Sequence, residues 1–372
     1  MSSPHRAGFV ALGLGREAAP LGPGLALLLA TGLGLMTPAP ARAAVSLQEG
    51  EFYLLAREPA VPAGSAFVPE RLYRHGSTRA GLLGPGWGST LETRLDLGPD
   101  GTVTLVAWGH LPRQAFTPLA GGAGAYRALA RTHTHCPQPC EDRVPAVLTR
   151  TATGYDLVTG ARLERFDARG RLVAVDLGRG AGWVVTHDRG GRPAAVRDRA
   201  GRTARFSYDS AGRATAITDA TGRGVRYRYD GAGRLTAVEA TGARRSRYTY
   251  VGATDSRLAT AAGPGVAPLR VRYAGPAGRH LVAEVREAGA EQGASSYTFE
   301  GFNASPPPGT KPVRLAHTHI TRGALKICAI DRFWLERDEA GRLWCVRSEA
   351  TVDGQRVVDT MHDRTGAVLL RR

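Results

Sequence analysis

Side chains of the kind that bind metals gather in one short segment. His133 and His135 lie two residues apart and are followed by Cys136 and Cys140. Residues two apart on a strand face the same side, so the two imidazoles could bind Zn²⁺ together with a thiolate. The spacing permits a metal site, and with it a metal-dependent hydrolase, without requiring either. We therefore treat this site as an alternative and expect no cofactor.

The cysteines allow a second interpretation in an oxidising compartment, where thiols pair. The chain has 4 cysteines, Cys136, Cys140, Cys328 and Cys345. Four cysteines allow three connectivities, and the sequence does not choose among them. We favour the pairs that are close in sequence, Cys136 with Cys140 and Cys328 with Cys345.

Other catalytic patterns are missing from the sequence. It has no Gly-x-Ser-x-Gly elbow, no phosphate-binding loop ending in Gly-Lys and no His-Glu-x-x-His motif. His317 and His319 repeat the His-Thr-His pattern without a neighbouring cysteine in sequence. The sequence therefore predicts a protein that is not an enzyme.

A repeat of 21 residues dominates the middle of the chain. The dipeptide Gly-Arg recurs at that interval, and an Asp stands three residues before each glycine. Asp favours the start of a turn and Gly supplies the positive φ that follows, so we expect these residues to form turns. The repeated turn residues are Asp167, Gly170, Arg171, Asp188, Gly191, Arg192, Asp209, Gly212, Arg213, Asp230, Gly233 and Arg234.

A second glycine-containing turn lies within the units, as in Asp198 to Arg202. Two turns in each unit leave two strands of about six residues, so every unit is predicted to be one β-hairpin. Val225, Tyr227 and Tyr229 alternate with arginines, which places the apolar side chains on one face.

Tyrosines recur with the same period. They suggest a stacking ladder for sugars or bases, but alternating aromatic residues usually pack in a core or across strands, and we favour packing. For the repeated arginines we favour bonds to the Asp or the carbonyls of the neighbouring unit over ligand contact. The tyrosines are Tyr208, Tyr227, Tyr229, Tyr248 and Tyr250.

Two regions in order resemble the Rhs family of bacterial proteins. Tyr208–Arg213 (YDSAGR) and Tyr229–Leu235 (YDGAGRL) are similar to its YD repeats, and Arg71–Arg74 (RLYR) with Leu83–Ser89 (LGPGWGS) looks like the β-rich module that precedes them. The resemblance implies a coiled sheet that gains a hairpin with each repeat and, in the largest members, closes around a C-terminal toxin. This chain has four clear units and lacks the Asp-Pro motif before such a toxin, so we do not expect it to deliver one alone.

The expected fold is all-β: a coiled, curved antiparallel sheet of YD-repeat hairpins, continuous with an N-terminal β module and capped by C-terminal hairpins. The expected divisions are a signal peptide (1–43), the Rhs-like module (44–131), a His/Cys/Pro loop (132–152), the repeat sheet (153–275), an irregular linker (276–312) and the C-terminal hairpins (313–372).

The first residues have the order of a secretory signal peptide. Arg6 and Arg16 precede an apolar run at 21–36, and the small residues Ala41 and Ala43 follow. The run is interrupted by glycines and is short for a membrane span, which needs about 20 apolar residues. We expect cleavage near Ala43, a mature chain without a transmembrane segment, and a periplasmic or secreted location.

Arginine dominates the charge of the chain. Lys+Arg 49 against Asp+Glu 33 gives a net charge of +16, and GC-rich coding would itself favour Arg together with Gly and Ala. We expect a non-catalytic scaffold that binds cell-surface polysaccharide or another envelope protein. The alternative is a reduced or accessory relative of Rhs toxins that docks to a larger toxin protein. Nucleic acid is not an expected partner.

Overall fold

The computed structural model is built almost entirely of β-strands. It describes residues 9–11, 41–47, 49–121, 124–128, 146–243, 245–264, 266–275, 280–287, 293–300, 313–322, 325–337, 343–362 and 368–371. Within these ranges the only helix is one 3₁₀ turn, η1 (Thr90–Glu92), and none is long and apolar enough to cross a membrane. The predicted all-β class is confirmed.

One antiparallel sheet of 20 strands holds the repeats, and its spatial order equals its sequence order. Its strands are β12 (Ala146–Arg150), β13 (Gly154–Thr159), β14 (Arg162–Asp167), β15 (Leu172–Gly178), β16 (Ala181–His187), β17 (Pro193–Asp198), β18 (Thr203–Tyr208), β19 (Ala214–Asp219), β20 (Gly224–Tyr229), β21 (Leu235–Ala240), β22 (Ser246–Tyr250), β23 (Leu258–Gly263), β24 (Val266–Ala274), β25 (Leu281–Glu287), β26 (Gly293–Glu300), β27 (Val313–Arg322), β28 (Leu325–Arg337), β29 (Leu343–Val352), β30 (Gln355–His362) and β31 (Val368–Arg371).

The N-terminal module forms separate, smaller sheets. The first has the order β1-β2-β3-β4-β7, the second β11-β10-β9-β8, and β5 pairs with β6. Their bounds are β1 (Phe9–Ala11), β2 (Ala41–Ser46), β3 (Glu51–Arg57), β4 (Glu70–Arg74), β5 (Ala80–Gly81), β6 (Gly84–Pro85), β7 (Trp87–Ser89), β8 (Arg94–Leu97), β9 (Val103–Ala107), β10 (Leu111–Pro118) and β11 (Tyr126–Ala128).

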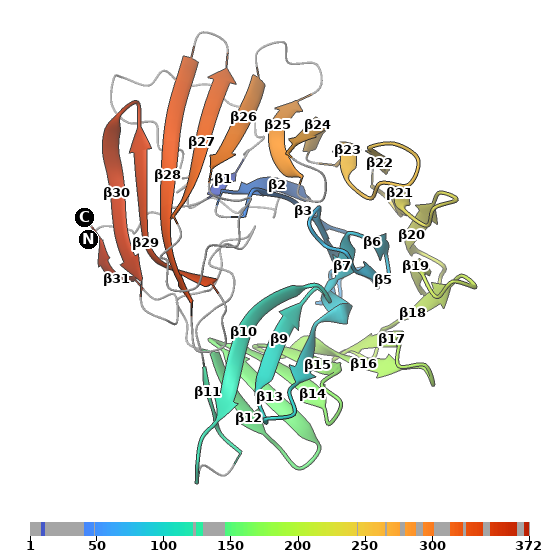
Figure 1. Ribbon diagram of the computed structural model, residues 1–372. Coiled ribbons are helices and arrows are strands. Elements are labelled where there is room, and N and C mark those ends of the chain that lie inside the picture. Colours follow the sequence, from blue (N-terminus) through green and yellow to red (C-terminus); the bar gives the residue numbers. More distant parts are fainter. Residues whose placement is uncertain are drawn as a thin grey trace.

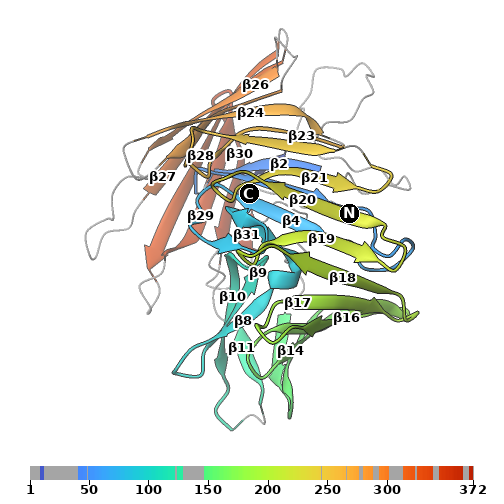
Figure 2. The ribbon, with the colours of Figure 1, turned by 90° about the vertical axis from the view of Figure 1, so that its right-hand side faces the viewer.

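The long sheet curves around the N-terminal module. Figures 1 and 2 show the blue and cyan strands of the module inside the arc drawn by the green, yellow and orange strands. We expected a sheet continuous with the module. Instead, among the described residues, no strand of the module belongs to the long sheet, and β-type pairing between the two is limited to the isolated bridges Arg94 with Arg171 and Ala125 with Thr149. The module therefore acts as the packing partner of the concave face, which would otherwise expose apolar side chains to water.

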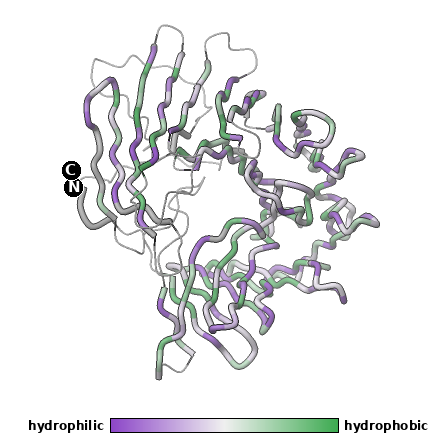
Figure 3. Tube along the Cα trace, viewed as in Figure 1, coloured by the Kyte–Doolittle hydropathy of each residue, from purple (hydrophilic) through white to green (hydrophobic). Residues whose placement is uncertain are grey.

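Module and repeats share one hydrophobic core. Trp87 and Leu95 of the module belong to the same buried cluster as Tyr227, Val238 and Leu258 of the repeats. Every second residue is buried along β20 and β22, as the period of two requires. Figure 3 shows hydrophilic and hydrophobic stretches interspersed along the whole trace. The sheet thus buries one face only.

The repeated turns have the predicted chemistry. In the unit that begins at Tyr208, the amide of Gly212 donates to the carbonyl of Asp209, and Gly212 has φ of 79°. The pairing register shifts between Ser207 and Tyr208, and again 21 residues later between Arg228 and Tyr229. This bulge bends each hairpin at the same position, which accounts for a sheet that curves regularly.

The region predicted to be an irregular linker differs from the expectation. β25 and β26 lie within 276–312 and join the sheet through pairs such as Val285 with Ser295. They carry alternating apolar residues without the Gly-Arg signature, so their strand pairing was missed. The C-terminal strands accordingly extend the sheet instead of forming a separate cap.

Candidate functional site

Each repeat turn is closed by an Asp–Arg clip. In one copy, Asp209 Oδ1 accepts the backbone N–H of Arg213 at 2.9 Å, and Asp209 Oδ2 accepts Arg213 Nε at 2.8 Å. Burial alone would raise the pKa of the Asp209 carboxyl, but these hydrogen bonds and the guanidinium charge hold it below its usual value. The same clip joins Asp167 to Arg171, Asp188 to Arg192, Asp198 to Arg202 and Asp230 to Arg234.

The arginine of the clip also contacts the next unit. The guanidinium of Arg213 lies over the ring of Tyr229, with 4.7 Å between its carbon and the ring centroid. Arg192 over Tyr208 and Arg234 over Tyr250 repeat the contact at 4.6 and 4.8 Å. We expected these arginines to reach the Asp of the neighbouring unit. That expectation was wrong: the carboxylate belongs to the same turn, and the neighbour contributes an aromatic ring.

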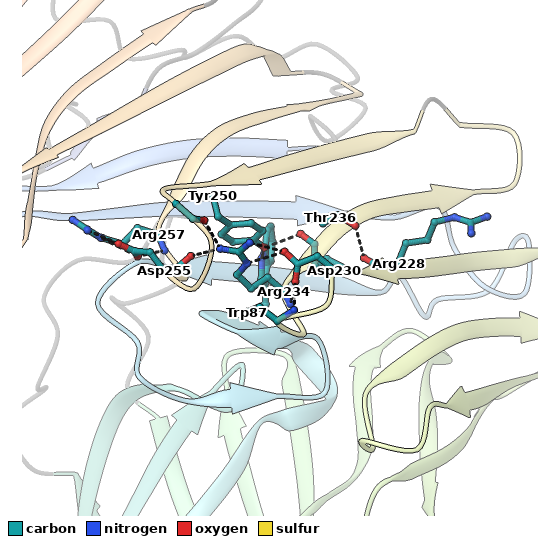
Figure 4. A network of polar contacts seen from close by, with 11 residues as sticks. Trp87, Arg228, Asp230, Arg234, Thr236, Tyr250, Asp255 and Arg257 are labelled. Carbon is teal, nitrogen blue, oxygen red and sulfur yellow. Dashed lines mark hydrogen bonds and ion pairs between the residues drawn. The ribbon is translucent and has the colours of Figure 1, made fainter.

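Carbonyls of the neighbouring unit do accept from one clip, as predicted. Figure 4 shows Arg234 between Asp230 of its own turn and the segment at Asp255. Arg234 Nη1 donates to the carbonyls of Gly252 and Asp255 at 2.9 and 2.7 Å. The next turn uses a shortened clip, in which Asp255 pairs with Arg257.

The tyrosines pack within the sheet. The hydroxyls of Tyr208, Tyr229 and Tyr250 donate to the carbonyls of Pro193, Ala214 and Leu235 at 2.5, 2.6 and 2.7 Å. Burial raises the pKa of all three phenols well above the usual value.

Tyr227 and Tyr248 are only 6% and 5% exposed and point into the core. The other three rings are partly buried and each is covered by an arginine, so the geometry agrees with packing.

A buried arginine joins the module to the repeats. Arg71 is 2% exposed and forms an ion pair with Glu58 of the module. Its Nη2 donates to the Tyr248 hydroxyl at 2.6 Å, and its guanidinium lies 5.6 Å from the Trp87 ring centroid. Trp87 in turn donates through Nε1 to the Tyr250 hydroxyl at 3.1 Å. Two of the tyrosines that suggested a ligand site, Tyr248 and Tyr250, therefore bind the protein's own N-terminal module.

A second joint uses the backbone at 82–84. The amide of Ala214 donates to the carbonyl of Leu82 at 2.8 Å. The amides of Leu82 and Ser89 both donate to the Glu92 carboxylate at 3.0 Å. Burial raises the pKa of the Glu92 carboxyl to about 7, against the opposing effect of those two N–H groups. Glu92 thus holds the loop that meets the repeat turns.

Other arginines share the opposite, convex face. Arg205, Arg226 and Arg247 are exposed and alternate with buried neighbours along β18, β20 and β22. Their cross-strand partners are Thr218, Glu239 and Ala262. These three arginines therefore lie on the face opposite the buried Tyr227 and Tyr248, apart from the clip arginines that contact the rings.

The predicted metal and disulfide sites fare differently. His133, His135, Cys136 and Cys140 lie outside the described residues, so the metal site and the Cys136–Cys140 disulfide stay predictions. Among the residues that the structure does describe, no group of three or more His, Cys, Asp or Glu side chains could hold a metal ion. The Cys328–Cys345 disulfide is wrong for this structure, in which Cys328 is free. Cys328 lies beside Asp353, whereas Cys345 pairs with Leu335, seven residues further along β28. At about 3.4 Å per residue, that separation exceeds disulfide reach.

The residues that join module and repeats were mostly missed by sequence reasoning. Arg71 and Trp87 entered only as part of the resemblance, and neither Glu92 nor Asp255 was assigned a role. The spacing of Asp255 and Arg257 departs from the repeat, so the period could not reveal this shortened clip.

Family models match both halves of this arrangement. The model described as RHS Repeat matches residues 208–246, and that described as a domain of unknown function, DUF6531, matches residues 43–110. The chain thus carries YD repeats of the Rhs type. A comparison of this YD-repeat protein with curated proteins gives no match.

Solved structures similar to the YD-repeat protein belong to much longer chains. The Tc holotoxin pore of Photorhabdus luminescens, carrying a substitution in TccC3, is 12% identical, with a TM-score of 0.33, 89% of this chain covered and 19% of that chain. TcdB2-TccC3 without its hypervariable C-terminal region is 10% identical, with a TM-score of 0.26, 88% of this chain covered and 23% of the other. This chain spans about a fifth of those chains.

Proposed function

We propose that the protein is a non-catalytic, extracytoplasmic scaffold that docks to a larger, toxin-bearing YD-repeat protein. The observation that carries the proposal is the open edge of the long sheet. β31 pairs with β30 on one side and, within the described part of the chain, with no strand on the other. A strand with one free edge offers a row of hydrogen-bonding groups to a further strand.

The two edges of the sheet differ. At β12 the amide of Arg150 donates to the carbonyl of Gly124 at 2.7 Å, so the segment at 124–125 covers this edge. At β31 the first three residues, Val368 to Leu370, are apolar, and the one charged residue of the strand, Arg371, stands at its end. Charged residues along an edge strand usually protect it from pairing, and β31 lacks them over its first three positions. A partner strand is therefore favoured at β31.

Affinity capture from the extracytoplasmic fraction tests the proposal. The tagged full chain should be found in that fraction and should retain a protein that itself carries YD repeats. Recovery from the cytoplasm, or as a monomer without such a protein, would contradict it.

A matched pair of variants tests the edge. Leu369 has no cross-strand partner in β30 because the register shifts there, so Leu369→Lys should leave β30 paired. We expect about a tenfold or greater loss of captured partner, since lysine on an edge opposes strand addition. Val147→Lys, at a residue that is 54% exposed on the covered edge, should change nothing. Equal capture by both variants would exclude docking at β31.

Polysaccharide binding remains a second candidate, favoured by the convex arginines alone. Arg205, Arg226 and Arg247 are exposed, and of the three only Arg226 has an acidic residue, Glu239, directly across from it. Their joint replacement by glutamine should abolish retention on a heparin column at moderate salt, because exposed charges bind polyanions through salt-sensitive attraction. Retention of this variant at the wild-type salt concentration would reject the candidate.

A further inference from the structure

The outer face of the C-terminal strands brings a free thiol opposite an imidazole. Cys328 on β28 is the direct cross-strand partner of His319 on β27. Residues directly opposite in an antiparallel pair have Cβ atoms about 4.5–5.5 Å apart and share a face. The buried residues Asp331 and Phe333 occupy the alternate positions of β28, so Cys328 and His319 lie on the outer side.

The surroundings keep the thiol accessible and place basic side chains beside it. Cys328 is free and half-buried, while His319 is exposed. Lys326, two residues before the cysteine on the same strand face, is also exposed. Thiolates are stabilised by neighbouring cationic side chains, and an imidazole within reach can accept the thiol proton.

A tight turn fixes the backbone at the cysteine. Asp353, with φ of 48°, and Gly354, with φ of 80°, form the hairpin turn between β29 and β30. The amide of Asp353 donates to the carbonyl of Cys328 at 2.8 Å, and the amide of Cys328 donates to the Asp353 carboxylate at 3.0 Å. The strand therefore holds Cys328 in register with His319.

We propose that Cys328 is a reactive thiol, with His319 as its base, and that it forms mixed disulfides with small-molecule disulfides. His319 accepts the Cys328 proton, and the thiolate sulfur attacks one sulfur of the disulfide. The S–S bond breaks, the second sulfur leaves as a thiolate, and that thiolate takes a proton. One disulfide is exchanged for another, so no further oxidant is consumed.

The chain offers a matched control for this reaction. His317 lies on the same strand and the same face, but its cross-strand partner is Ile330. His317 lies beside a carboxylate instead of a thiol: its Nε2 is 3.2 Å from Glu300 Oε1. Replacing His317 removes a histidine from this face without touching the pair.

The experiment compares rates of modification by 5,5′-dithiobis(2-nitrobenzoate) and by oxidised glutathione. In a Cys136→Ser, Cys140→Ser, Cys345→Ser background, His319→Ala should slow the reaction about tenfold at neutral pH and move its pH–rate profile upward. His317→Ala should react as the background protein does.

Peptide mapping of the unaltered full chain supplies an independent readout, which should find glutathione on Cys328. Absence of this adduct, or the same rate and profile in both histidine variants, would overturn the proposal.

Discussion

Arg213 performs two tasks at once: it closes its own turn against Asp209 and covers the ring of Tyr229, the first residue of the next unit. The distances are 2.8 Å from Arg213 Nε to Asp209 Oδ2 and 4.7 Å from the guanidinium carbon to the Tyr229 ring centroid. A planar guanidinium can pair with a carboxylate and stack on a ring, whereas an ammonium cannot do both.

Arg213→Lys should therefore destabilise the protein although the charge is kept. We expect a loss of about 1–2 kcal/mol in the free energy of unfolding, from the second hydrogen bond and the ring contact. Urea unfolding measures it. Arg205→Lys, on the convex face, should stay within about 0.5 kcal/mol of the wild type. Similar losses in the two variants would show that the clip adds nothing.

Gly84→Ala should disturb the joint between module and repeats. Gly84 has φ of +85°, and a Cβ there would lie 2.4 Å from the carbonyl oxygen of Gly233. Both segments are backbone and cannot easily move apart, so we expect the free energy of unfolding to fall by about 3 kcal/mol. Gly222 has φ of +77° but faces open space, so Gly222→Ala should cost only about 1 kcal/mol. Thermal unfolding of the two variants should show a larger drop in the melting temperature for Gly84→Ala. The difference measures the steric clash with Gly233, because both variants share the backbone strain of a positive φ.

Glu92→Gln should alter the pH dependence of stability. The pKa of the Glu92 carboxyl in the folded protein, about 7, lies above its ordinary value of 4.5, so the fold prefers the protonated carboxyl. This contribution is complete below about pH 4.5 and is lost as the pH rises to about 7, which amounts to about 3 kcal/mol. Denaturant unfolding from pH 4 to 8 should show a steeper decline for the wild type than for Glu92→Gln. Parallel curves would mean that Glu92 does not titrate in this range.

Arg71→Met should be costly alone and milder in combination. Removing the cation leaves Glu58 buried without a partner, which we expect to cost about 3–5 kcal/mol. In the double variant Arg71→Met with Glu58→Gln, the uncompensated charge is gone and much of the loss should return. A double variant as unstable as the sum of the two single variants would argue against direct coupling.

Periodicity predicted the repeat hairpins well because both turns of a unit depend on local chemistry. Asp209 and Gly212 need only their own backbone to form a turn, so the sequence shows them directly. The module joint depends on contacts between distant segments, such as Arg71 with Tyr248, separated by 177 residues. A pattern within one unit cannot show which face a distant segment covers, and the tyrosines therefore looked available to a ligand.

The pairing register of β28 and β29 explains why the predicted Cys328–Cys345 disulfide is wrong. Cys328 and Cys345 are 17 residues apart, close enough in sequence to suggest a pair across one hairpin. They do lie on adjacent strands, but the turn at Asp353 and the register of Ala329 with Val352 place Cys328 near the far end of β29. The pairing register of two strands decides which residues lie opposite each other. The sequence does not show this register where no compact turn joins the two strands.

The alternation of clip and ring contact also determines how the repeat strands unfold locally. From Asp188 to Tyr273 the clip arginine of one hairpin covers a ring of the next, with 4.6, 4.7, 4.8 and 5.3 Å from the guanidinium carbon to the ring centroid. No hairpin in this series can detach without uncovering its neighbour's aromatic ring. Such nearest-neighbour coupling makes local fluctuations cooperative. Amide hydrogens of these strands should therefore exchange at one shared rate, although the hairpins follow one another along the chain.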